Sequence, residues 1–405
     1  MAYAFLAILI VNHALSSGLR TVHTLMATGV SAEMGLMAAD LGAFAGAYNI
    51  TFAIMQIPVG IALDRYGPRF TCGVSMALTA MGAAISAGAP TFEILLLGQA
   101  IIGAGCSSAL MGSFVFTSNW FAHDRFAAIS SILMALGSVG IVATSTPLAI
   151  LMEHVGWRGA FWTLAACAAF MSCLILSVIR DHPRGAEPDE KVQESVLQAI
   201  NGMIQMFTDY RLLGILCVGL MAYPVKLTLR SVWVGPYFSD VHQLDAITVG
   251  NIVLIISFAV VMGPLCALLC SRFLARKWIV FYSVFGGGGL LVLLPPLSGY
   301  DAKVDMMLLS LTILILGFYV LTFTSVRHRF PVSHAGRALS TLNFSIFVGV
   351  ALWQVCSGIL LNIIAPDPAQ PDLASYDVMF IIMGLCTMIS GIVYLFTRPK
   401  SNWTP

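Results

Sequence analysis

The chain has 405 residues, of which 59% are hydrophobic and only 10% charged, with a formal net charge of +1 and a mean hydropathy of +0.90. A soluble domain of this length could not cover so large an apolar excess with so little polar surface, so a water-soluble globular protein is excluded. The balanced charge also excludes a nucleic-acid partner, which a strongly basic surface would attract.

Apolar runs of about 20 residues, the length that crosses a bilayer core, recur along the whole chain. Backbone groups in lipid must hydrogen-bond internally, and the alternating pattern of a membrane barrel is absent from the sequence, so these runs are predicted to be helices. We predict an all-α integral membrane protein with twelve transmembrane helices. The predicted spans are 3–26, 36–62, 70–89, 92–120, 127–152, 157–179, 212–236, 246–270, 278–298, 304–326, 337–364 and 376–397.

The distribution of basic residues predicts the orientation of these spans. With the N-terminus inside, nearly all loop lysines and arginines fall on the inner side, and only Arg158 and Lys303 fall on the outer side. Acidic residues such as Glu33, Asp240 and Asp305 occupy the predicted outer turns. This positive-inside bias predicts a multi-pass protein of a bacterial inner membrane with both termini cytoplasmic.

The two halves of the chain contain similar sequence segments at corresponding positions. The linker 180–211 separates a predicted N-terminal six-helix bundle, 1–179, from a C-terminal one, 212–405. Within the linker, apolar residues at helical spacing predict an amphipathic helix on the inner membrane surface. L-R-T-V at Leu19–Val22 reappears as L-R-S-V at Leu229–Val232, so an arginine has the corresponding position in each half.

A charged turn between two spans carries the clearest family signature. The sequence G-I-A-L-D-R-Y-G-P-R, Gly60–Arg69, resembles the loop between the second and third helices of major facilitator superfamily transporters. G-W-R-G-A-F at Gly156–Phe161 and G-A-G at Gly103–Gly105 extend the resemblance over the chain. It implies two parallel six-helix repeats and secondary transport. It also implies a cytoplasmic gate that pairs the halves, formed by Asp64, Arg65, Arg69 and Arg125.

The sequence differs at one position from a subgroup of that family, the proton-driven drug exporters. Gln99 stands where many proton-driven drug exporters of the superfamily carry an arginine, and the first span lacks the acidic residue that such members often use. Both differences lower the expectation of proton/drug exchange.

Once the loops and the ends of the spans are set aside, three charged side chains remain inside predicted spans, and all of them are basic: Arg20, Lys226 and Arg230. Each costs about 2.5–3.5 kcal/mol at mid-bilayer, and no carboxylate at that depth neutralises them, since Asp40 and Glu93 lie near the outer ends of their spans. We therefore expect a water-filled cavity that receives an anion. Arginines paired on the first and seventh helices also resemble the phosphate clamp of organophosphate:phosphate antiporters. In the alternative interpretation Arg20 and Arg230 bind helix carbonyls, and the long Lys226 stem reaches another level of the cavity.

Other polar residues complete the predicted site. Tyr48, Tyr319 and Asn343 are candidates to contact the solute, although hydrogen bonds between helices explain such residues equally well. His23 lies near Arg20, and an unperturbed imidazole titrates near neutral pH, so His23 is a candidate for proton coupling. The alternative is a neutral histidine that bonds a neighbouring helix.

The missing motifs narrow the function further. The sequence has no phosphate-binding loop, no hydrolase motif and no metal-ligand spacing, so we predict a non-enzyme that uses no cofactor or metal. We predict a monomeric secondary transporter that moves a small organic anion, preferably a carboxylate, by alternating access, together with a proton or a counter-anion. The alternatives are an organophosphate/phosphate exchanger, a proton-coupled drug exporter and a transporter-like receptor.

Overall fold

The structure is a computed structural model that describes residues 2–121, 129, 132–134, 136–182, 205–299, 301–329, 332–368 and 370–397. All regular elements in that part of the chain are helical, and the described residues form no strand, which confirms the all-α prediction. By their contacts the residues divide into two compact units. The first comprises Met1–Leu36, Asp40–Val196 and Ala246–Asn251, and the second comprises Met37–Ala39, Leu197–Asp245 and Ile252–Pro405.

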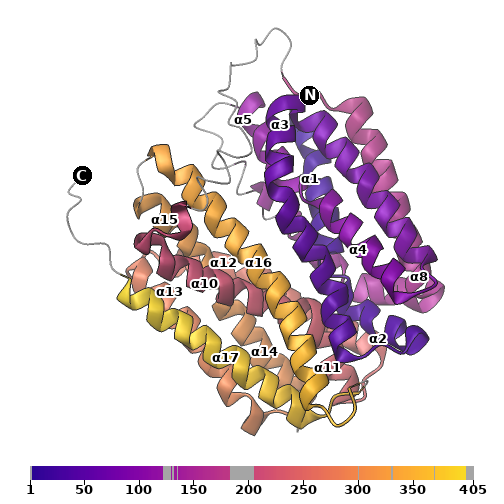
Figure 1. Cartoon of the computed structure of the whole chain (residues 1–405), viewed down its shortest axis with the longest axis vertical. Coiled ribbons are helices and arrows are strands. Elements are labelled where there is room, and N and C mark those ends of the chain that lie inside the picture. Colours follow the sequence, from indigo (N-terminus) through magenta and orange to yellow (C-terminus); the bar gives the residue numbers. More distant parts are fainter. Residues whose placement is uncertain are drawn as a thin grey trace. The chain divides into compact units, whose positions relative to one another are not determined.

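Long helices that lie side by side build the first unit (Figure 1). Its described helices are α1 (Ala2–Leu19), α2 (His23–Met34), α3 (Ala38–Gly88), α4 (Phe92–Cys106), α5 (Ala109–Trp120), α7 (Val139–Ala143) and α8 (Thr146–Val178). An apolar core joins α1, α3, α5 and α8, in which Leu9, Phe116 and Ile175 are fully buried.

Two glycines divide the longest helices of this unit. Gly67 within α3 (φ 77°) and Gly156 within α8 (φ 67°) leave helical geometry, in the left-handed region that glycine adopts without strain. The kink in α3 separates the predicted spans 36–62 and 70–89. At Gly67 a Cβ atom would lie only 2.6 Å from the Asp181 carboxyl carbon, so the turn has a second reason to keep glycine.

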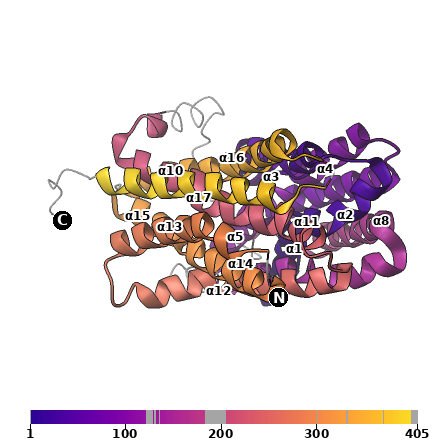
Figure 2. The same cartoon turned by 90° about the horizontal axis from the view of Figure 1, so that it is seen from below.

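The second unit contains the remaining helices, apart from Ala246–Asn251 of α12, which belong to the first unit. They are α10 (Tyr210–Thr228), the π-helix η1 (Leu229–Trp233), α11 (Val234–Asp240), α12 (Ala246–Cys270), α13 (Arg276–Leu293), the 3-10 helices η2 (Pro295–Leu297) and η3 (Gly317–Val320), α14 (Ala302–Leu316), α15 (Leu321–Arg329), α16 (Val332–Ile364) and α17 (Leu373–Phe396). Figure 2 shows α17 and α13 side by side. Their backbones meet at Gly288 and Gly384, where a Cβ on either would lie about 2.5 Å from the other's carbonyl oxygen, the small-residue contact typical of membrane helices.

The described residues include nine helical stretches that are long and apolar enough to cross a membrane. Two of these stretches contain the kinks at Gly67 and Gly156. The count of twelve spans stays a prediction, since the span 127–152 includes residues outside the described part of the chain. Most of the linker 180–211, with its amphipathic helix, also lies outside the described residues, so the predicted domain boundaries remain untested.

The G-W-R-G motif holds three helices of the first unit together. Trp157 Nε1 donates to Glu33 Oε2 at 2.7 Å, and Arg158 donates from Nε and Nη2 to Glu33 Oε1 at 3.0 and 2.7 Å. Arg158 Nη1 donates to the carbonyl oxygens of Ala87 and Ala89 at 3.0 and 2.8 Å. The cluster therefore joins the last turn of α2, the kink in α8 and the end of α3.

We expect Glu33 to make part of the stability pH-dependent. Hydrogen bonds from Arg158 and Trp157 lower the pKa of Glu33 from its ordinary value of 4.5. A depressed pKa adds stability that is fully present above pH 4.5 and is lost as the pH falls through the folded-state pKa. Thermal unfolding between about pH 6 and 3 should show this loss in the native protein and a smaller one in Glu33→Gln. Glu153→Gln, at an exposed position of α8, is the control, and equal pH dependence in all three proteins would contradict the expectation.

Candidate functional site

Both copies of the repeated arginine lie where a helix is irregular. In the first unit α1 ends at Leu19 and α2 begins at His23, so Arg20 lies in a turn within the predicted first span. In the second unit Arg230 lies in the π-helix η1, between α10 and α11. Short π-helical turns are frequent at functional sites, and irregular backbone at membrane depth occurs where it is buried in protein or lines a cavity.

Aromatic rings surround Arg20 in the first unit. The guanidinium carbon is 4.7 Å from the centre of the Phe52 ring, a cation–π contact. Phe52 stacks on Tyr48 at 5.9 Å, and the buried Tyr48 hydroxyl donates to the Ser16 carbonyl oxygen at 3.4 Å. The structure thus brings two of the predicted site residues, Arg20 and Tyr48, against the same ring, Phe52.

His23 belongs to a buried hydrogen-bond chain. Its Nε2 lies 3.1 Å from Gln99 Oε1, and Gln99 Nε2 donates to Ser86 Oγ at 3.0 Å. The imidazole also meets Phe44 edge-on, with ring centres 4.7 Å apart. Sequence reasoning noticed Gln99 only as a departure from drug exporters, because nothing in a linear pattern pairs it with a histidine 76 positions away.

Lys226 is held between two tyrosine rings in the second unit. Its side chain is 2% exposed, and Nζ is 5.3 Å from the ring centres of both Tyr223 and Tyr319. Tyr319 belongs to the 3-10 turn η3, which interrupts the helical run between α14 and α15. In the part of the chain that the structure describes, no carboxylate forms an ion pair with this ammonium group. The ring faces attract the cation without neutralising it.

Arg230 is fully buried, and the residues that it contacts differ from those that contact Lys226. Its Nε and Nη2 donate to Ser257 Oγ at 3.1 and 3.0 Å. The adjacent Ser231 Oγ accepts a hydrogen bond from Gln354 Nε2 at 3.1 Å. These bonds connect the π-helical turn to α12 and α16.

Asn343 is the last of the residues predicted to contact the solute. Its side chain is half-buried on α16, and its role in binding stays a prediction.

Comparison with known families decides what kind of protein carries these residues. The family model "Major Facilitator Superfamily" matches residues 8–353. The chain belongs to this superfamily. It is therefore a multi-pass membrane transporter, and its family is one of transporters and not of enzymes.

Individual relatives of this superfamily member are distant. It is 29% identical over 142 residues to the "Probable L-galactonate transporter" of Escherichia coli, a match that covers 35% of this chain and only 31% of that relative. It is 22% identical over 385 residues to the "Probable sulfoacetate transporter" of Cupriavidus necator, covering 91% of this chain and 87% of the relative. A solved bacterial homolog of the human lysosomal transporter Spinster, inward-facing and occupied, shares the fold, with a TM-score of 0.75, 14% identity and coverage of 97% and 96%.

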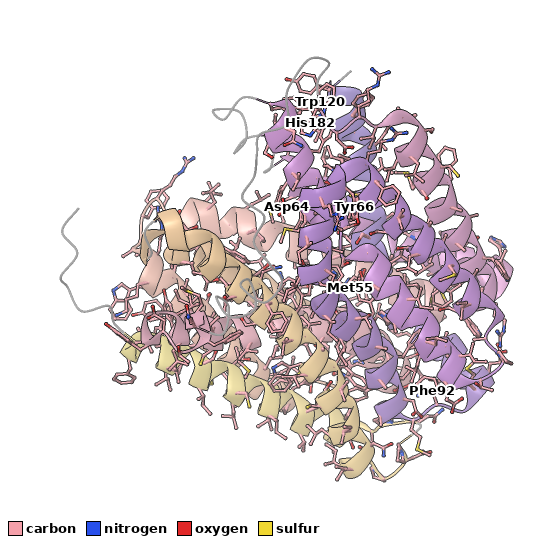
Figure 3. All side chains as sticks on the ribbon, turned by 45° about the horizontal axis from the view of Figure 1, so that its top comes forward. Met55, Asp64, Tyr66, Phe92, Trp120 and His182 are labelled. Atoms are coloured by element: carbon pink, nitrogen blue, oxygen red, sulfur yellow. The ribbon has the colours of Figure 1, made fainter. Side chains whose placement is uncertain are left out.

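The charged turn Gly60–Arg69 lies in the first unit, and the contacts that the structure describes for it are within that unit. Asp64 and Arg65 are exposed near the kink of α3. The Arg69 backbone N–H donates to Asp181 Oδ1 at 2.6 Å, and its Nε donates to the Leu176 carbonyl oxygen at 2.8 Å, which fixes α3 to the end of α8. Figure 3 shows Trp120 and His182 together at this end of the unit and Phe92, where α4 begins, at the opposite end. The role as a gate stays a prediction, and Arg125 lies outside the described residues.

One predicted outer-turn acid of the superfamily member has an environment that the sequence did not indicate. Asp305 lies near the outer end of its predicted span, 304–326, where an acidic side chain is expected to be exposed. In the structure Asp305 is 0% exposed, in the first turn of α14 and within an apolar stretch long enough to cross a membrane. Its partners come from α11 and from the segments that follow α11 and η2, which no local sequence pattern could reveal.

Proposed function

We propose that the protein is a secondary active transporter that moves a small organic anion across the membrane by alternating access, with a carboxylate as the charge that it binds. The observation that carries this proposal is Lys226, a fully buried ammonium group for which the described residues provide no carboxylate. An uncompensated buried charge costs several kcal/mol. An anionic solute supplies the missing counter-charge, and its binding biases the equilibrium between transporter states.

The two arginines of the repeat are the other ligands that we propose for the anion. Arg20 and Arg230 hold corresponding positions, both on irregular helix turns, and a guanidinium group binds a carboxylate through two parallel hydrogen bonds. Broken helices near the membrane midplane form the binding sites of many secondary transporters. Tyr48, Tyr319 and Asn343 would contact the rest of the solute, and His23 would couple binding to a proton.

The relatives support an anion and favour a carboxylate. The names of two of them specify L-galactonate and sulfoacetate, and both of these compounds carry a carboxylate group. An arginine pair would also bind a phosphate ester, so exchange of organophosphates is the second candidate.

The same proposal includes the orientation of the chain. The positive-inside distribution of the loop residues supports cytoplasmic termini, and the turn with Asp64, Arg65 and Arg69 would then lie on the cytoplasmic side. There it would act with Arg125 as a gate. We propose that a single copy of the chain performs the full cycle.

A flux assay in liposomes tests the proposed function. The purified protein would be reconstituted and offered radiolabelled L-galactonate, sulfoacetate and glycerol 3-phosphate, with neutral galactitol and the cation ethidium as counterparts. We expect uptake of the carboxylates alone, with mutual competition. Uptake of ethidium or galactitol that the anions do not inhibit would refute the proposal, and exchange of glycerol 3-phosphate alone would replace it with the organophosphate alternative.

Lys226→Met separates a binding role from a structural one. Because the change removes a buried charge and keeps an unbranched apolar stem, we expect thermal stability to stay equal or to rise. Affinity for the anion should fall by about 10-fold or more, the value of one charge-assisted contact. Competition binding and a thermal unfolding scan measure the two effects, with the exposed Lys303→Met as control. Unchanged affinity together with a lower melting temperature would make Lys226 structural.

A further inference from the structure

A second buried polar cluster lies in the second unit, away from the contacts of Lys226 and Arg230. The Asp305 Oδ2 atom accepts hydrogen bonds from the Tyr237 hydroxyl at 2.6 Å and from the Gly299 backbone N–H at 3.0 Å. The same oxygen lies 2.7 Å from His242 Nε2. All three groups therefore converge on one carboxylate oxygen. In the part of the chain that is described, the buried Oδ1 atom has no hydrogen-bond partner.

The groups that face this pair are acids and phenols. Tyr376 lies beside Tyr237, with ring centres 5.2 Å apart, and its hydroxyl donates to Asp240 Oδ2 at 2.8 Å. Asp377 Oδ1 accepts a hydrogen bond from Ser298 Oγ at 3.1 Å, next to the peptide that binds Asp305. The contacts that the described residues make in this cluster include no lysine or arginine. His242 is the group there that can carry a positive charge.

Because Asp305 is buried, one proton decides the net charge of the pair formed by His242 and Asp305. The Asp305 side chain is 0% exposed, and an ionised carboxylate removed from water needs a nearby positive charge as well as hydrogen bonds. The His242 side chain keeps 10% of its surface exposed, so its ring connects the buried acid to water. An imidazole gains and loses its proton in the neutral range, and two groups in such contact titrate as one unit.

We propose that His242 and Asp305 form a proton-binding site at the junction of α11, η2 and α14. One proton from water binds to the pair, as an N–H on His242 facing the carboxylate or as an O–H on Asp305, and the cluster is then electrically compensated. Release of this proton to water leaves a buried negative charge beside Asp240 and Asp377. That charge weakens the junction, so the proton stabilises the packing of α11, η2 and α14 against one another. The site does not depend on the identity of the transported anion.

Infrared difference spectroscopy tests the site directly, with the full chain in lipid nanodiscs and no solute added. Stepping the pH between about 5 and 8 should produce carboxyl and imidazole bands that follow a single one-proton titration. Asp305→Asn and His242→Gln should each abolish this component. His154→Gln, at an exposed position of α8, is the matched control and should leave it intact. A wild-type titration that Asp305→Asn leaves unchanged would overturn the proposal.

A milder variant keeps the test valid if the charge-removing variants fold poorly. Tyr237→Phe keeps every charge and removes one hydrogen bond to the carboxylate, so the midpoint should move to higher pH by about one unit. Amide hydrogen exchange in 237–242 and 301–306, corrected for the intrinsic rate, should increase as the pair loses its proton. An unmoved midpoint, or exchange that follows the intrinsic rate alone, would show a static ion pair. Neither readout uses transport, so failure of the proposed function would leave this result independent.

Discussion

Arg20→Gln and Arg230→Gln are each expected to lower the uptake of an anionic solute by about 100-fold or more, because each removes a charge-assisted bidentate contact worth up to about 3 kcal/mol. Glutamine keeps a planar hydrogen-bond donor but is shorter than arginine and has no charge. The initial rate of uptake of labelled L-galactonate and sulfoacetate into liposomes measures the effect. Both variants should be affected, because we propose both arginines as ligands of the solute.

The matched controls separate lost charge from lost fold. Arg272→Gln changes the same residue type at an exposed position of the second unit and should transport normally. Arg230→Lys keeps the charge without the two-pronged geometry and should fall between the native protein and Arg230→Gln. Size-exclusion profiles and melting temperatures report folding. Normal uptake by both glutamine variants would show that the arginines serve only to hold helices, as the alternative interpretation has it.

Gly103→Ala is expected to be strongly destabilising in the first unit. A Cβ at this position would lie 2.8 Å from the Tyr48 carbonyl carbon and still closer to its oxygen, so the backbones of α4 and α3 would have to move apart. Overpacking of this kind costs about 1–3 kcal/mol or more and exceeds the gain of about 1 kcal/mol from replacing a helical glycine with alanine. We expect the melting temperature to fall by about 5 °C or more.

A second helical glycine provides the control for this prediction. At Gly289 in α13 a Cβ would meet nothing within 4 Å, so Gly289→Ala should leave the melting temperature equal or slightly higher. The structure thus has a backbone contact at Gly103 and open space at Gly289. A fall of equal size in both variants would mean that the Gly103 contact is not what limits stability. Displacement of Tyr48 would also alter the Arg20 ring cluster, so uptake should fall further than stability alone predicts.

Much of the architecture could be predicted from the sequence because membrane helices leave a strong linear signal. Apolar runs of the right length predicted the helical fold, and the turn Gly60–Arg69 with G-W-R-G indicated the superfamily. The duplicated L-R motif predicted matching positions for Arg20 and Arg230. It could not predict that the backbone is irregular at both, because a turn or a π-helical insertion within an apolar run leaves the composition unchanged.

The sequence by itself determined the class of protein, the helical spans and the presence of basic residues inside them, since these depend on composition and on spacing along one helix. Only the tertiary structure decided which side chains meet. It gave His23 its partner Gln99, placed Lys226 between Tyr223 and Tyr319, and brought His242 and Tyr237 to a buried Asp305. Contacts between helices far apart in the chain depend on how the helices pack, and the pattern of any one segment does not contain that information.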